Sequence, residues 1–160
     1  MKRTVLALAA ALLLHAGPAA AGEAKPFVPG SWAEIRDAHA GKPLAVHLWS
    51  ITCGPCLVEL PAWNRFRRDH PGVAVVLVST DRPEDAARAR QVLTKAGLDD
   101  AESWTFADPF AARLRHELDP GWRGELPRTL LLAPDGTRTV VQGADIAAVE
   151  RWADGQLPGR

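Results

Sequence analysis

The stretch WSITCGPCLVELP, residues 49–61, holds both cysteines of the chain, Cys53 and Cys56. Two residues separate them, and this spacing fits a redox-active dithiol, half of a metal site or a small structural disulfide. A bridge across two residues closes a very short loop, and the stabilisation that a disulfide gives grows with loop length. A disulfide between these cysteines would therefore add little stability, and a functional thiol pair is favoured.

The residues on either side predict a strand followed by a helix. Residues 44–50 (LAVHLWS) form a short apolar run typical of a buried strand. A helix is expected over about residues 55–70, and Pro55 suits its first turn because the missing proline N–H would have no partner there. Cys53 should therefore lie at or near the N-cap of this helix.

This placement divides the work between the two sulfurs. The dipole and the unpaired N–H groups of a helix N-terminus favour an anion, so we expect the pKa of Cys53 to lie well below that of a free thiol. Cys53 would then be the nucleophile. Cys56 lies one turn further into the helix, where it can attack a mixed disulfide on Cys53 and release the partner reduced.

Beyond this stretch, strand and helix patterns alternate. The β-branched run at residues 73–80 predicts a strand with both faces covered by helices, and Asp81 with Glu84 predicts the start of a helix that ends near Ala96. Strands alternating with helices predict an α/β fold with a central mixed sheet flanked by helices. The other expected elements are helices at 32–40, 109–118 and 144–156, a strand at 103–108, and a hairpin at 128–143.

The first 21 residues have the layout of a secretory signal peptide. Lys2 and Arg3 precede an apolar run of about ten residues, whereas a membrane span needs roughly 20. Small residues end the run and predict cleavage after Ala21, with an uncleaved membrane anchor as the alternative. The expected organisation is a signal peptide at 1–21, an extended lead-in at 22–30 and a single domain at 31–160.

The charge balance excludes one class of partner. The formal net charge is 0, and loss of residues 1–21 removes two cations and no acid, which leaves −2. A near-neutral chain without a basic run has no electrostatic footprint for nucleic acid. About 139 residues would remain, enough for one domain with its own core.

With these features, the sequence resembles the thioredoxin fold. The resemblance rests on C-G-P-C between a strand and a helix with Trp49 upstream, and it spans roughly Pro43 to the C-terminus. The export signal, Glu59-Leu60-Pro61 and Pro127 within GELPRTLLLAPDGT are similar to the periplasmic TlpA/ResA branch of thiol–disulfide oxidoreductases. The expected hairpin followed by an amphipathic helix at the C-terminal end agrees with this fold.

The resemblance also implies roles for further residues. Pro127 matches the cis-proline beside the cysteine pair, and the backbone of Leu126 would bind a substrate segment as an added strand. Glu59 matches a buried glutamate that handles the proton of the resolving thiol; it lies three residues after Cys56, on the same helix face. The residues expected to shape the site or bind substrate are Trp49, Thr52, Gly54 and Pro55.

Two positions depart from the usual thioredoxin pattern. His47 stands six residues before Cys53, where thioredoxins usually carry a buried aspartate. Histidine titrates near neutrality and could act as a proton relay, but a neutral core histidine with one hydrogen bond is the favoured interpretation. Thr52 replaces the usual tryptophan just before the first cysteine, which removes a flat aromatic surface from the rim.

The expected activity is reduction of disulfides in exported proteins, and the resemblance implies targets such as apocytochrome c or copper-site proteins. The redox centre would be the Cys53–Cys56 pair without another cofactor, in a monomer that, again by resemblance, is recharged by a membrane thiol donor of the DsbD/CcdA type. The alternative is a copper-binding carrier, because two thiolates and a histidine suit Cu(I). Against this, copper chaperones of this fold space their cysteines C-x₃-C, and a zinc site would want four ligands.

Overall fold

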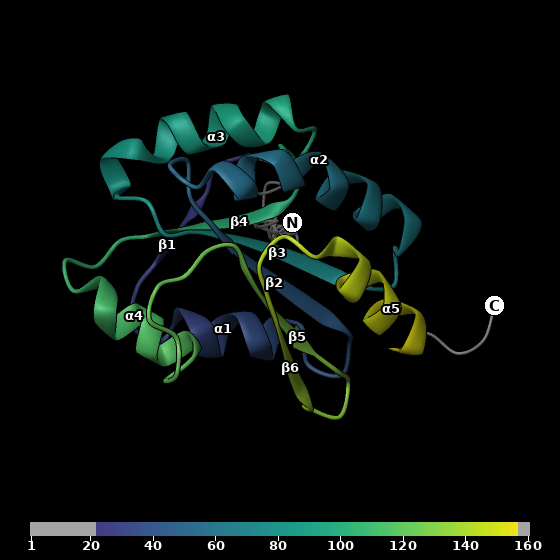
Figure 1. Ribbon diagram of the computed structural model, residues 1–160. Coiled ribbons are helices and arrows are strands. Elements are labelled where there is room, and N and C mark those ends of the chain that lie inside the picture. The colour runs from purple at the N-terminus through teal and green to yellow at the C-terminus, as the bar shows by residue number, and fades with distance from the viewer. Residues whose placement is uncertain (1–21, 157–160) are drawn as a thin grey trace, which may run out of the picture.

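The computed structural model describes residues 22–156, so the expected signal peptide lies outside the described residues. Six strands form one sheet in the order β1-β4-β3-β2-β5-β6, with helices on both faces (Figure 1). Between residues 22 and 156, no helix is long and apolar enough to span a bilayer. The elements are β1 (Lys25–Phe27), α1 (Ser31–Ala38), β2 (Leu44–Trp49), α2 (Gly54–Asp69), β3 (Ala74–Ser79), a 3-10 turn (Pro83–Asp85), α3 (Ala86–Lys95), β4 (Glu102–Phe106), α4 (Ala111–Leu118), β5 (Arg128–Leu132), β6 (Arg138–Gln142) and α5 (Ile146–Gln156).

The sheet is mixed, as the sequence predicts. Strands β1, β4, β3 and β2 are parallel, while β5 runs antiparallel to β2 and β6 antiparallel to β5. The expected hairpin is therefore β5–β6, and α5 follows it. Part of the extended lead-in also joins the sheet, since Phe27 of β1 pairs with Phe106 of β4. The folded sheet thus begins before residue 31, where the sequence places the start of the domain.

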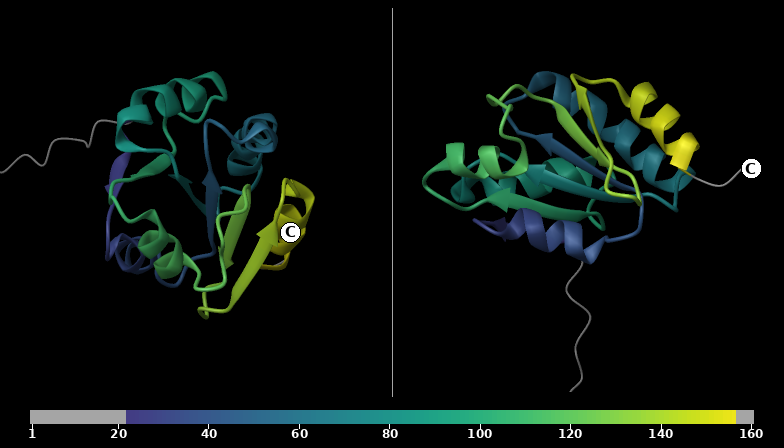
Figure 2. Two further views of the ribbon diagram at one scale, coloured as in Figure 1. Left: turned by 60° about the vertical axis from the view of Figure 1, so that its left-hand side comes forward. Right: turned by 90° about the horizontal axis from the view of Figure 1, so that it is seen from below.

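Two helical layers enclose the sheet. Helices α2, α3 and α5 cover one face, and α1 and α4 cover the other (Figures 1 and 2). All six residues of β2 are buried, which explains its continuous apolar pattern: both of its faces pack against a helical layer. Buried residues of the first layer include Trp63, Phe66, Leu93 and Val149, and those of the second include Trp32, Ile35, Leu114 and Leu118.

Strand register brings three loops to one edge of the sheet. Trp49, the last residue of β2, pairs with Ser79 at the end of β3. On the other side of β2, Leu48 pairs with Arg128, the first residue of β5. The loop after β2, the loop after β3 and the loop before β5 therefore meet at the carboxyl end of β2, where the cysteine pair begins α2.

The expected helix start at Asp81 is wrong. A 3-10 turn at Pro83–Asp85 comes first, and α3 begins only at Ala86. Asp81 is buried, and its carboxylate accepts hydrogen bonds from Ser50 Oγ (2.6 Å), Ser79 Oγ (2.6 Å) and the Ile51 backbone N–H (2.9 Å). The side chain therefore joins two loops rather than capping a helix.

Candidate active site

Cys53 is the N-cap of α2, as the sequence predicts. Its backbone is extended (φ −93°, ψ 99°), and its Sγ accepts a hydrogen bond of 3.2 Å from the Cys56 backbone N–H. Gly54 and Pro55 form the first turn of the helix. On reduction, the Cys56 N–H would still face the Cys53 sulfur at the positive end of the helix dipole, an arrangement that stabilises a thiolate.

The two cysteines form a disulfide and differ in exposure. The bond joins Cys53 and Cys56 across a Cα–Cα distance of 5.2 Å. Cys53 is half-buried, whereas Cys56 is fully buried in the core cluster beneath α2. A partner can therefore reach Cys53 but not Cys56. This asymmetry is what an attacking thiol and a resolving thiol require.

The rim of the site is formed by the residues on either side of Cys53. Thr52, Gly54 and Pro55 are exposed, and the Thr52 N–H donates to Ser50 Oγ at 3.1 Å. Trp49 is only 1% exposed, so it does not form part of the surface that a partner meets. It packs in the same core cluster as Cys56 and supports the site from inside.

Sequence reasoning missed an apolar surface next to the disulfide. Val58 is 83% exposed and Leu57 is 37% exposed, although both follow directly after the buried Cys56. The signal was present in the helix period: positions one and two residues beyond a buried residue point away from its face. These two side chains add apolar surface to the rim beside Cys53.

The loop before β5 contributes the expected cis-proline. The Leu126–Pro127 peptide bond is cis, which confirms the geometry that the resemblance implied. Half-buried Leu126 packs against the same core cluster as Cys53, and Pro127 is buried. The Pro127 carbonyl accepts hydrogen bonds from the Gly143 N–H (2.9 Å) and from Gln142 Nε2 (3.1 Å). The end of β6 therefore holds the loop that contains the cis-proline.

Glu59 lies one turn beyond Cys56 and is only 8% exposed, so the expected burial is confirmed. Burial raises the pKa of Glu59 to about 7; the Trp63 indole acts in the opposite direction, and the negative charge of Asp145 adds to the rise. By distance and angle, neither Glu59 Oε2 nor Trp63 Nε1 has a hydrogen-bond partner among residues 22–156. Glu59 can therefore hold or release a proton near neutral pH.

His47 is fully buried and neutral. Burial lowers the pKa of His47 to about 3, and its Nδ1 lies 3.1 Å from Thr129 Oγ1. The ring packs against the Trp63 indole with 4.6 Å between centroids. The favoured interpretation, a neutral core histidine with one hydrogen bond, is confirmed. Its second nitrogen, Nε2, lies 3.8 Å from Glu59 Oε2.

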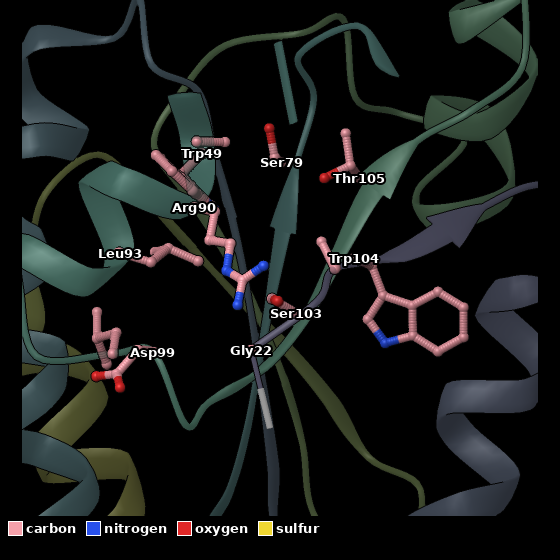
Figure 3. A pocket seen from close by; sticks show the side chains of 12 residues that line it. Gly22, Trp49, Ser79, Arg90, Leu93, Asp99, Ser103, Trp104 and Thr105 are labelled. Atoms are coloured by element: carbon pink, nitrogen blue, oxygen red, sulfur yellow. The ribbon is translucent and has the colours of Figure 1, made fainter. Parts of the chain in front are cut away.

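A small cavity between α3 and the sheet is separate from this chemistry. Its volume is about 10 Å³, room for about one water molecule, and Arg90, Asp99 and Ser103 are among its lining residues (Figure 3). It cannot admit a protein segment. Within residues 22–156 there is also no cluster of three or more histidine, cysteine, aspartate or glutamate side chains suited to a metal ion.

The likeness to known proteins is one of structure. No family model and no curated protein matches the sequence. The chain is similar to DsbF of MTB (TM-score 0.61, 19% identity, 76% of this chain and 85% of that one). It is also similar to a putative thiol:disulfide interchange protein DsbE from Chlorobium tepidum (TM-score 0.58, 23% identity, 76% and 84%) and to a secreted Mycobacterium tuberculosis disulfide oxidoreductase homologous to E. coli DsbE (TM-score 0.54, 22% identity, 66% and 72%).

These likenesses, together with the strand order, define the fold: the chain has the thioredoxin fold, with a CxxC disulfide at the start of the helix that follows β2. The identities are all below 25%, so the similarity establishes the architecture and not the activity of the chain.

Proposed function

We propose that the protein is a thiol–disulfide oxidoreductase that reduces disulfides of exported proteins through Cys53 and Cys56. The observation that carries the proposal is the asymmetry of the disulfide. One cysteine is accessible at a helix N-cap, and the other is buried one turn before a glutamate of raised pKa. A purely structural bridge needs neither an accessible sulfur nor a neighbouring proton acceptor.

The reaction takes place in two exchanges. The Cys53 thiolate attacks a partner disulfide, a Cys53–partner bond forms, and the first partner sulfur leaves as a thiolate with the electron pair of the broken bond. Cys56 then gives its proton to the Glu59 carboxylate and attacks Cys53 Sγ. The Cys53–Cys56 bond forms, and the second partner sulfur leaves with the other electron pair. The dithiol is oxidised by two electrons, and the two partner sulfurs take up protons to become thiols.

The direction and the partners rest on the sequence resemblance. The Gly54-Pro55 pair resembles reducing thioredoxins, with potentials near −270 mV, rather than the oxidant DsbA near −120 mV. The partners proposed are exported proteins with oxidised cysteines, such as apocytochrome c or copper-site proteins. A membrane thiol donor of the DsbD/CcdA type would restore the dithiol of a periplasmic, monomeric protein. One structurally similar protein is, by its name, secreted.

Substrate binding would combine backbone and apolar contacts. The segment around Leu126 offers main chain for an added strand, a mode that accepts many sequences because it reads backbone groups. Val58 and Leu57 lie on the α2 side of Cys53 and would contact apolar side chains of the partner. Such a surface favours unfolded or partly folded substrates with accessible disulfides.

Reduction of insulin tests the activity. Reduced wild-type protein, recharged by dithiothreitol, should accelerate insulin reduction, and Cys53→Ser should abolish the acceleration. Cys56→Ser should instead accumulate a mixed disulfide with insulin, because the resolving thiol is missing. Full activity of Cys53→Ser would overturn the proposal. Equilibration with glutathione decides the direction: a potential near −270 mV supports a reductant, and one near −120 mV an oxidant.

A further inference from the structure

Two buried polar atoms face each other one helical turn beyond Cys56. His47 Nε2 and Glu59 Oε2 lie 3.8 Å apart, and neither has a hydrogen-bond partner among residues 22–156. His47 is 0% and Glu59 8% exposed, so solvent water does not readily satisfy either atom. Buried polar atoms left without partners are unfavourable, and a pair that needs only a small approach to form a hydrogen bond calls for an explanation.

The other nitrogen of the ring is held by the neighbouring strand. His47 and Thr129 are register partners across the antiparallel β2–β5 pair, and Nδ1 lies 3.1 Å from Thr129 Oγ1. A neutral histidine carries its proton on one nitrogen, and a threonine hydroxyl can donate or accept. The ring can therefore donate to Thr129 and point a lone pair at Glu59, or accept from Thr129 and point an N–H at Glu59.

The carboxyl group distinguishes the two arrangements. A carboxylate only accepts hydrogen bonds, so a histidine lone pair would repel ionised Glu59, whereas an N–H can serve it in both protonation states. We propose that His47 is the Nε2–H tautomer, fixed by the Thr129 hydroxyl, and acts as a positioning residue that donates to Glu59 when this carboxyl ionises. The donor is an uncharged imidazole, so it would stabilise the carboxylate by a hydrogen bond and not by an ion pair.

The charges around Glu59 make this donor matter. Asp145 precedes α5, which packs on α2, and its negative charge opposes ionisation of Glu59. From β5 comes the uncharged Thr129, and from α2 the Trp63 indole. Within the described part of the chain, no cation balances Glu59, so the His47 N–H joins the Trp63 indole as a group placed to stabilise its carboxylate.

The inference rests on the proposed function, in which Glu59 accepts the proton of Cys56. A carboxyl that stays protonated at neutral pH cannot accept that proton. By favouring the ionised form, the His47 N–H keeps a larger share of Glu59 ready as a base. Loss of the donor should therefore slow the second exchange and shift its pH dependence upward, while the first attack by Cys53 is unaffected.

Nitrogen-15 NMR of the oxidised wild-type protein tests the tautomer without any redox partner. The expected spectrum shows His47 with a protonated Nε2 and an unprotonated Nδ1, and the reverse would overturn the proposal. Thr129→Val, nearly identical in shape, removes the hydroxyl donor and should shift the ring toward the Nδ1–H form. An unchanged tautomer in this variant would contradict the role given to Thr129.

Carbon-13 NMR titration of Glu59 tests the donor. His47→Leu should raise the midpoint by about one pH unit or more, a tenfold smaller carboxylate fraction. His47→Gln, whose amide can donate, should restore much of the shift, and His39→Leu, remote from Glu59, should leave it unchanged. An unshifted midpoint in folded His47→Leu would overturn the inference; if that variant does not fold, the Gln variant and the tautomer decide. Failed insulin reduction would refute the proposed function but would not alter either NMR result.

Discussion

The carboxylate of Asp81 accepts a hydrogen bond of 2.6 Å from the hydroxyl of Ser50, which ties the loop after β3 to the loop that carries the cysteine pair. The Ser50 carbonyl in turn accepts a 3.1 Å hydrogen bond from the Cys53 N–H. Asp81 also accepts from the Ile51 N–H, so one buried side chain organises the entry to α2. The position of the Cys53 sulfur is thus set by a residue on a different loop.

Replacement of Asp81 by asparagine should destabilise this junction. The amide keeps the size of the side chain, but its nitrogen cannot accept, so at least one buried donor among Ser50, Ser79 and Ile51 loses its partner. We expect the free energy of unfolding to fall by about 1–3 kcal/mol in urea denaturation. Glu84→Gln, in the exposed turn nearby, should stay within about 0.5 kcal/mol of wild type; equal effects from both variants would refute this role of Asp81.

Folding should transfer a proton from His47 to Glu59. The unfolded side chains titrate at about 6.5 and 4.5, whereas burial lowers the pKa of His47 to about 3 and raises that of Glu59 to about 7. Between pH 4.5 and 6.5 the unfolded chain holds this proton on His47 and the folded chain holds it on Glu59. In this window the two effects on the free energy of unfolding nearly cancel. Below pH 4.5 the free energy of unfolding falls as the pH drops, and above pH 6.5 it falls as the pH rises toward 7.

Glu59→Gln should remove the contribution of Glu59 to the pH dependence of stability and leave that of His47. The contribution of Glu59 to the free energy of unfolding of the wild type decreases as the pH rises from 4.5 to 7. The free energy of unfolding of the variant should therefore increase relative to that of the wild type over this range. The expected slope is about 1.4 kcal/mol per pH unit, or about 3 kcal/mol over the window. Urea denaturation at half-unit pH steps measures it, with the exposed Glu34→Gln as the control. A difference that does not vary with pH would show that Glu59 ionises normally.

The features that the sequence predicted best depend on residues close together along the chain. Cys53 at a helix N-cap follows from Gly54-Pro55, because these residues constrain the same few bonds that form the cap. Asp81 was placed wrongly because its hydrogen bonds reach Ser50, 31 positions away along the chain, while the local pattern imitates a helix start. The burial of Trp49 follows from the apolar run of β2, but its place in one core cluster with Cys56 depends on how α2 packs on the sheet.

The contact between His47 and Glu59 lay beyond sequence reasoning for a related reason. Each residue was singled out by its distance from a cysteine along the chain, one before the pair and one after it. Their meeting depends on how α2 packs across β2, and the Thr129 hydrogen bond depends on the β2–β5 register. Neither is encoded in a local pattern. The site is therefore a local helix cap combined with a nonlocal buried proton site.

Val58 should matter for protein substrates and not for stability. It is 83% exposed next to the disulfide, so Val58→Ser removes apolar contact surface without opening the core. We expect a higher KM for insulin reduction with little change in kcat, and an unchanged rate with a small disulfide such as oxidised glutathione. Val140→Ser, on the edge strand β6, is the matched control. An identical KM for wild type and Val58→Ser would exclude a substrate contact here.

The reactivity of the Cys53 thiol can be isolated in Cys56→Ser, where it is the remaining sulfhydryl. Only the thiolate reacts with iodoacetamide, and the N–H groups at the start of α2 stabilise that form. The alkylation rate should therefore reach half its maximum at a lower pH than for free cysteine. In 1 M salt the difference should shrink only partly, because screening weakens the helix dipole but not the hydrogen bond from residue 56. If the two profiles coincide, the N-cap does not activate the sulfur, and the assignment of Cys53 as the attacking thiol is wrong.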